Sequence, residues 1–232
     1  MPEQVKNEYN IPVYVNAWLA EIGVNTGYPR GGPIARMMPV WRAAAPNIDL
    51  YAPDIYVENF KEVCDEYAQA GNPLFIPEIK NTSIVGAKLF YPVGEHGALG
   101  ISPFGIDQLP DDHPMALSYK ILNNLNPLLI QFNGSGKTKG FYLYDKTTDT
   151  LNFEKVKIQV QKYSEYPGDN SAVASGGIII QVSETEYFIA GMNFNVQFIQ
   201  YEKTENIEFI YIEEGEFNEN TWEKGRRIKT GR

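Results

Sequence analysis

Carboxylate and aromatic side chains follow apolar segments in the first half of the chain. Glu78 comes directly after Phe75–Pro77, and a carboxylate at the end of a buried strand needs hydrogen bonds or a function to offset its desolvation. A structural salt bridge with Lys80 or a nearby arginine explains Glu78 equally well. Aromatic rings beside a carboxylate also suit a sugar, whose C–H faces pack on rings while its hydroxyls bind acids and amides. The other polar and aromatic residues at such segment ends are Asn16, Trp18, Asp54, Tyr56, Ser102, Phe104 and Asp107.

These residues need a scaffold that brings segment ends together. Apolar runs alternate with helical patterns from residue 11 to about 131, which predicts βα units around a parallel sheet. In such a sheet functional residues gather at the carboxyl edge of the strands. A doubly wound sheet is disfavoured, because no glycine-rich turn follows the first run. The predicted strands are Ile11–Leu19, Ile48–Tyr56, Pro73–Ile79 and Ala98–Ile106, and the predicted helices run from Pro33 to before Pro46 and over Asn59–Ala70, Thr82–Glu95 and Pro114–Phe132.

The second half of the chain has a different pattern. GSGKTKG after Asn133 predicts a flexible link, and the segments beyond it alternate in the β manner, which predicts an antiparallel sandwich or jelly-roll. We therefore expect two domains, at residues 1–132 and 133–232, with GRRIKTGR as a solvated basic tail. The predicted strands are Gly140–Tyr144, Lys155–Tyr163, Gly177–Val182, Glu186–Gly191, Gln197–Glu202 and Ile207–Glu213.

Composition limits the possible partners. The 232 residues are 43% hydrophobic and carry a formal charge of −9, which favours a folded protein that binds neither nucleic acid nor anionic lipid. Cys64 is the only cysteine and is predicted to lie in the core, and the two histidines, His96 and His113, predict no zinc site. The polar start MPEQVKNEYN lacks the apolar segment of a signal peptide, so we expect a cytoplasmic protein as written; a preceding region with a signal peptide would make it periplasmic or secreted.

Long stretches of the sequence resemble one family. PVYVNAWL, YPRGGPIARMMPVWRAAAPNIDLYAPDIY, FKEVCDEYAQAGNPLFIPEIK and GEHGALGISPFGID resemble the later part of the catalytic barrel of bacterial β-galactosidase-like proteins of glycoside hydrolase family 35. GGIIIQVSETEYFIAGMNFNVQF and IEEGEFNENTWEKGRRI are similar to the β-rich module of unknown function that follows that barrel.

The resemblance implies a fold and an active site. The four predicted strands would be the fifth to eighth of a (β/α)₈ barrel, and Glu78 would be the nucleophile of a retaining β-galactosidase-like enzyme. Tyr56 would hydrogen-bond Glu78 and orient it, and no metal or organic cofactor is implied. The residues implied to line the sugar pocket are Asn16, Trp18, Asp54 and Phe104.

The sequence departs from the family at the proton donor. The acid/base glutamate of these enzymes follows the fourth strand, whereas Glu3 and Glu8 lie in a polar leader and match no such position. Without the roughly 10²–10⁴-fold contribution of general acid catalysis, we expect this chain to be inactive or weak by itself. The alternative is a non-catalytic carbohydrate-binding or assembly protein, a remnant of a glycosidase. Open edges on a half-barrel also predict a homodimer, or assembly with a separate N-terminal piece.

Overall fold

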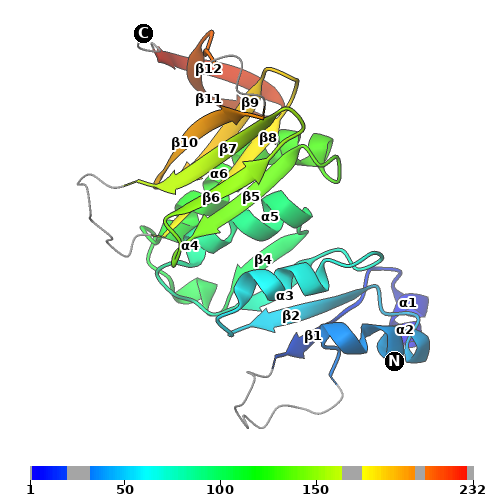
Figure 1. Cartoon of the computed structure of the whole chain (residues 1–232). Coiled ribbons are helices and arrows are strands. Elements are labelled where there is room, and N and C mark those ends of the chain that lie inside the picture. Colours follow the sequence, from blue (N-terminus) through cyan, green and yellow to red (C-terminus); the bar gives the residue numbers. More distant parts are fainter. Residues whose placement is uncertain (1, 20–31, 164–173, 202–206, 229–232) are drawn as a thin grey trace. The chain divides into compact units, whose positions relative to one another are not determined.

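Parallel and antiparallel sheets occupy separate parts of the chain. The computed structural model describes residues 2–19, 32–163, 174–201 and 207–228 (Figure 1). The chain forms two compact units, Met1–Val85 with His96–Pro110 and Gly86–Glu95 with Asp111–Arg232. The first unit holds a parallel four-stranded sheet and the second holds antiparallel sheets, so the predicted combination of a βα region and a β-rich region is confirmed at this level. The boundary near residue 132 stays a prediction.

The sheet of the first unit has its strands in chain order. Each strand lies inside a predicted apolar run, and all neighbouring pairs are parallel. Within the described residues the sheet is open, with the first and last strands at its edges, and it does not close into a barrel. The strands are β1 (Tyr14–Trp18), β2 (Leu50–Ile55), β3 (Phe75–Ile79) and β4 (Gly100–Pro103).

Helix α3 (Phe60–Tyr67) lies across the sheet at β2 (Figure 1). Its predicted apolar stripe is confirmed, because Phe60, Val63, Cys64 and Tyr67 are all buried. The helix ends before the predicted Ala70, and the side chain of Asn59 makes no capping hydrogen bond. The helix predicted from Pro33 begins later, as a 3₁₀ turn followed by an α-helix. The remaining helical elements of this unit are α1 (Pro2–Glu8), η1 (Ala35–Met37), α2 (Met38–Ala44) and η2 (Ile106–Gln108).

The helix predicted over Thr82–Glu95 is two helices. Helix α4 (Val85–Lys88) ends before Leu89, and α5 (Phe90–His96) starts at the next residue. Pro92 lies in the first turn of α5, where a helix needs no backbone N–H, so the break before it satisfies the proline. Helix α5 ends at His96, one residue beyond the predicted Glu95.

The second unit contains one long helix and eight strands in the described residues. Helix α6 (Pro114–Phe132) has the predicted bounds, and the Nδ1 atom of His113 accepts a hydrogen bond from the amide of Met115 at its start. The strands are β5 (Thr138–Leu143), β6 (Thr148–Asn152), β7 (Val156–Lys162), β8 (Ser175–Gln181), β9 (Tyr187–Met192), β10 (Phe194–Gln200), β11 (Ile212–Asn218) and β12 (Thr221–Ile228).

The strand prediction for this unit is correct for five strands and fails at β6, β11 and β12. Predicted segments overlap β5, β7, β8, β9 and β10, although Glu202, the last residue predicted for β10, lies outside the described residues. The predicted strand Ile207–Glu213 is wrong, because β11 starts only at Ile212. Strands β6 and β12 are absent from the prediction, since neither has an alternating apolar pattern.

Strand β8 is the centre of the second unit. All of its residues are buried, because the β10-β7-β6 sheet covers one face and helices cover the other. Ile179 belongs to a core cluster shared with β6 and β7. Ile178 and Ile180 pack with Phe90 of α5 and with Leu125 and Leu128 of α6.

Glycines bring residues 86–95 against the β5-β8-β9 sheet at backbone distance. A Cβ atom on Gly140 of β5 would lie 2.3 Å from the carbonyl oxygen of Phe90, and one on Gly176 of β8 would lie 2.3 Å from that of Ala87. On the helix side, a Cβ on Gly94 would lie 2.6 Å from the Cα of Gly140. Only glycine allows the two backbones to come this close. Residues 86–95 therefore belong to the β-rich unit, although they lie between β3 and β4 in sequence.

The predicted flexible link GSGKTKG is wrong. Gly134 and Gly136 have φ values of 70° and 74° and form a turn, in which the Oγ of Ser135 donates a 2.6 Å hydrogen bond to the carbonyl oxygen of Phe132. Strand β5 then begins at Thr138.

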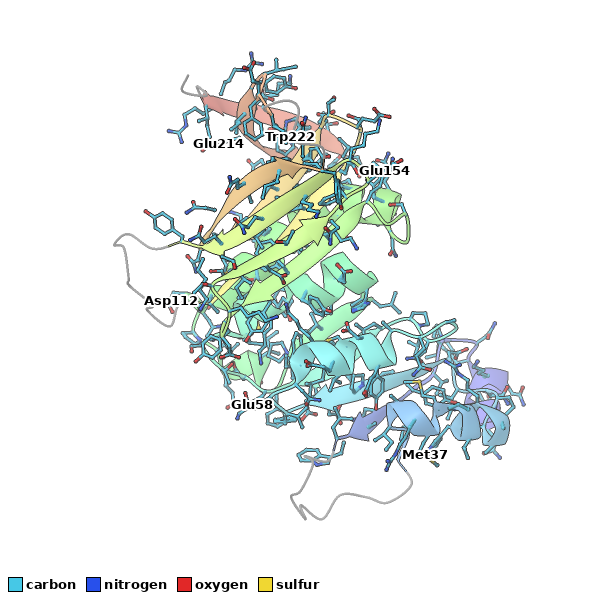
Figure 2. All side chains as sticks on the ribbon, viewed as in Figure 1. Met37, Glu58, Asp112, Glu154, Glu214 and Trp222 are labelled. Atoms are coloured by element: carbon cyan, nitrogen blue, oxygen red, sulfur yellow. The ribbon has the colours of Figure 1, made fainter. Side chains whose placement is uncertain are left out.

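The predicted basic tail is also wrong in its first half, because residues 225–228 belong to β12; residues 229–232 lie outside the described part. Arg226 is 2.8 Å from Glu214 of β11, so its charge is paired within the β11–β12 ribbon. Trp222 of β12, labelled in Figure 2, packs edge-on against Phe188 of β9, with 4.9 Å between the ring centroids. This contact anchors the ribbon.

Candidate functional site

Three residues of the predicted site form a row across the sheet of the first unit. Trp18 is the register partner of Asp54, and Asp54 is the partner of Glu78. Partners on parallel strands project their side chains to the same face, so these three side chains share one face at the carboxyl ends of β1, β2 and β3. Asn16 precedes Trp18 by two residues and Tyr56 follows Asp54 by two, which places both on that face as well.

A proline stands directly before each of the two carboxylates. Pro53 precedes Asp54 and Pro77 precedes Glu78, and both lie inside strands. Proline has no backbone N–H to donate, and the β3–β4 register shifts between Ile76 and Ile79, around Pro77. The β1–β2 register stays regular through Pro53 and Asp54, so only Pro77 coincides with an irregular ladder. The repeated Pro-acid pair is present in the sequence but was not part of the prediction.

The hydroxyl of Tyr56 donates a hydrogen bond to Oε1 of Glu78. Burial raises the pKa of Tyr56, and the hydrogen bond to Glu78 raises it further. The phenol consequently keeps its proton and remains a donor. Among the described residues Glu78 forms no ion pair with Lys80 or an arginine, so the salt-bridge explanation of Glu78 has no support there.

The ring of Tyr56 is stacked on Trp18. Their centroids are 5.4 Å apart and their planes differ by 23°. Trp18 is 47% exposed, so part of the indole remains available to a ligand while the rest supports the phenol. The stack fixes the Tyr56 ring, whose hydroxyl is hydrogen-bonded to Glu78. The exposed part of the Trp18 indole forms the outer surface of the stack.

Asp54 is the most buried polar residue of the site, with 6% of its surface exposed. The Nδ2 of Asn16 donates a 2.9 Å hydrogen bond to its Oδ2. Among the described residues, its Oδ1 has no hydrogen-bond partner and is closed to solvent. Burial raises the pKa of Asp54 to about 6, the Asn16 hydrogen bond opposes this shift, and the charge of Glu78 adds to it.

Phe104 does not join the aromatic stack. Its amide donates a 3.0 Å hydrogen bond to the carbonyl oxygen of Ile79, which fixes its backbone beside β3, but its side chain is 63% exposed. In the described part of the chain its ring makes no stacking contact with Trp18 or Tyr56. Ser102 and Asp107 are also exposed and make no site contact among the described residues. The structure thus brings together Asn16, Trp18, Asp54, Tyr56 and Glu78 and leaves Phe104 at the margin.

Within the described residues, no cluster of three or more His, Cys, Asp or Glu side chains is arranged to bind a metal ion. None of the described helices combines the length and the apolar character needed to cross a membrane.

One family model matches part of the chain. Residues 115–229 match the profile of a family described as a domain of unknown function, DUF5597. The match covers slightly less than half of the sequence, begins with α6 and continues through β12. No curated protein matches the chain. All of the candidate site residues precede the matched range, so the resemblance of that region to a glycoside hydrolase stays a prediction.

Proposed function

We propose that the first unit carries the nucleophile half of a retaining, β-galactosidase-like glycoside hydrolase site. In this proposal its open sheet corresponds to the last four strands of a (β/α)₈ barrel, and the β-rich unit is an accessory sandwich. The observation that carries the proposal is the hydrogen bond from Tyr56 to Glu78 at the carboxyl ends of adjacent parallel strands. A carboxylate in that position, held by a neutral donor, has the orientation and the charge that a nucleophile needs.

The proposed reaction has two displacements. An oxygen of Glu78 attacks the anomeric carbon, and the bond to the leaving oxygen breaks with its electron pair, which gives a glycosyl ester on Glu78. Water then attacks the anomeric carbon and Glu78 leaves as a carboxylate; the proton that this water loses passes to solvent, from which the departed leaving oxygen takes up a proton when it is basic enough. Tyr56 keeps its proton throughout and positions the attacking oxygen.

The remaining site residues support sugar binding in this proposal. The exposed face of Trp18 offers a platform for the C–H face of a pyranose. Asn16 and Asp54 are hydrogen-bonded to one another and form the polar side of the site. Phe104, exposed beside β3, is placed at the rim.

A retaining mechanism also needs a second carboxyl, about 5–5.5 Å from the nucleophile, to protonate the leaving oxygen. Asp54 does not fill this role, because its Oδ1 is closed to solvent and its Oδ2 is bonded to Asn16. The proposed activity of this chain is therefore weak for substrates with poor leaving groups. The same observation supports the alternative function, a non-catalytic carbohydrate-binding or assembly protein descended from a glycosidase.

A fluorosugar separates the two functions. A 2-deoxy-2-fluoro-β-galactoside with a dinitrophenyl leaving group needs little acid assistance, so the nucleophile half reacts and the ester accumulates. We expect peptide mass spectrometry to find the adduct on Glu78, to lose it in Glu78→Gln, and to keep it in the control Glu62→Gln, which alters an exposed glutamate of α3. Galactoside binding without an adduct at saturating reagent would support the alternative, and absence of both would reject the two functions together.

A further inference from the structure

Asp54 is the buried ionisable group whose chemistry the proposed reaction leaves unexplained. It lies next to Glu78 in register on the neighbouring parallel strand, so the two carboxyl groups share one face of the sheet. Two carboxylates on adjacent strand positions repel one another, and this repulsion is strongest where water is excluded.

The surroundings of Asp54 favour its neutral form. Its Oδ2 accepts a hydrogen bond from Asn16, but no described residue donates to its Oδ1, and solvent does not reach that atom. An ionised carboxylate there would leave half of its charge without a hydrogen bond, whereas a protonated carboxyl leaves only a neutral oxygen unpaired.

The described groups that interact with Asp54 come from all three strands of the site. They are Asn16 of β1, which is neutral, Tyr56 directly after β2, which keeps its proton, and Glu78 of β3, which is the charged one. No described cation opposes the repulsion from Glu78 at this carboxyl. Burial acts in the same direction and raises the pKa of Asp54 to about 6.

We propose that Asp54 is a positioning residue whose protonated form is the reactive one, because Glu78 is then the single carboxylate anion on this face of the sheet. This inference rests on the proposed function of Glu78 and assigns a proton to its neighbour. When Glu78 becomes a glycosyl ester it loses its charge, and the repulsion that holds the proton on Asp54 disappears. Asp54 is therefore a stronger acid in the glycosyl-enzyme than in the free protein.

The first test measures the proton without any sugar. In the full chain with ¹³C-labelled aspartate side chains, we expect one carboxyl carbon to titrate near pH 6. This signal should vanish in Asp54→Asn, persist in the control Asp49→Asn, and move to lower pH in Glu78→Gln. Titration of Asp54 near the ordinary value of about 4, or a pKa that does not respond to Glu78→Gln, would overturn the inference.

The second test connects the proton to the reaction. We expect the pH profile of fluorosugar labelling in the wild type to contain an ionisation that matches the Asp54 titration and to lose it in Asp54→Asn, whatever the absolute rate of that variant. A profile with the same ionisation in both proteins would refute the positioning role. A purely structural aspartate would not account for loss of the ionisation in Asp54→Asn. If Asp54 titrates as expected but Glu78 takes no label, the proposed function fails and the role of Asp54 in the reaction fails with it, while the protonation of Asp54 itself stands.

Discussion

Tyr56 and Glu78 are 22 residues apart in sequence, and the hydroxyl of the first donates a hydrogen bond to the carboxylate of the second. The contact exists because β2 and β3 are adjacent and parallel, so the residues at their carboxyl ends meet. Helix α3 occupies the intervening sequence and covers the sheet. The site is thus a product of the βα connection and not of any local motif.

Removal of the Tyr56 hydroxyl should slow the attack by Glu78. A hydrogen bond to a charged group contributes about 1.5–3 kcal/mol, so Tyr56→Phe should lower the rate of fluorosugar labelling roughly 10–100-fold. Stopped-time mass spectrometry gives this rate. The control Tyr163→Phe removes an exposed hydroxyl from the other unit and should label at the wild-type rate; equal rates for Tyr56→Phe and wild type would show that the hydrogen bond is not used.

Loss of the indole should weaken sugar binding more than it slows the chemical step. Trp18→Ala removes the exposed platform and the partner of the Tyr56 ring, and an aromatic pair contributes about 0.5–1.5 kcal/mol beyond its buried area. We expect the inactivator to bind roughly 2–10-fold more weakly, with Trp18→Phe in between. Tyr9→Ala, which removes another exposed ring of the same unit, is the matched control. An unchanged binding constant in Trp18→Ala would place the sugar elsewhere.

The stability of the protein should depend on pH through Asp54. The pKa of Asp54 is raised from 3.8 to about 6 in the folded state, so folding binds a proton between these values. The stabilisation is complete below about pH 4 and is lost as the pH rises through about 6, by at most about 3 kcal/mol. In urea titrations Asp54→Asn should therefore become more stable relative to the wild type as the pH rises from about 4.5 to about 7.5.

Asp49 provides a control of opposite sign. The hydrogen bond from Lys6 and that from the amide of Val13 hold the pKa of Asp49 below its usual value. Its stabilising contribution is present above the unfolded pKa and is lost as the pH falls through the folded one. Asp49→Asn should thus lose stability relative to the wild type at neutral pH and approach it in acid. The same pH trend in both variants would contradict the assignment of Asp54.

The close glycine contacts of the β-rich unit should not tolerate a methyl group. Gly140→Ala and Gly176→Ala each place a Cβ 2.3 Å from a backbone oxygen, and such overpacking typically costs about 1–3 kcal/mol. Gly100→Ala places its Cβ 3.2 Å from the ring of Phe75, which can adjust, so this variant is the milder control. Thermal unfolding measures all three. Equal midpoints for Gly140→Ala and Gly100→Ala would show that residues 86–95 do not pack as described.

The open edges of the parallel sheet should recruit a partner. Tyr14 and Trp18 of the edge strand β1 are each 47% exposed, and Phe104 beside β4 is 63% exposed. Under our proposal two copies associate through these edges. Size-exclusion chromatography with light scattering should therefore report a dimer. The variant Tyr14→Lys should shift the equilibrium toward the monomer. A stable monomer of the wild-type chain would contradict this association.

Buried elements were predictable from sequence because burial leaves a pattern. The apolar runs around β2 and β3, the stripe of α3 and the bounds of α6 all follow from it. Exposed elements leave no such pattern, so the second half of β12, with the charged sequence GRRI, is predicted as part of a solvated tail. Packing of Trp222 and ion pairs with β11 hold this strand in place. Hydrophobic periodicity along the sequence does not reveal such long-range contacts.

The same distinction applies to the site. The predicted strand ends place Trp18, Asp54 and Glu78 in register with one another, because parallel strands align their carboxyl ends, whereas their role as a site stays a prediction. The pairing of Asn16 with Asp54 and the closed Oδ1 atom depend on side-chain directions and on what covers them, which no spacing rule specifies. The exposed position of Phe104 follows from the turn after β4, where the left-handed Gly105 redirects the chain.

The interleaving of the two units limits how this chain can be divided. Residues 86–95 lie between β3 and β4 in sequence yet pack with the β-rich unit, so a cut at any single peptide bond leaves at least one unit without a part of itself. A fragment that starts at α6 would leave the glycine surfaces of β5 and β8 without their helical cover. Recombination at one junction therefore cannot transplant the β-rich unit intact onto another protein.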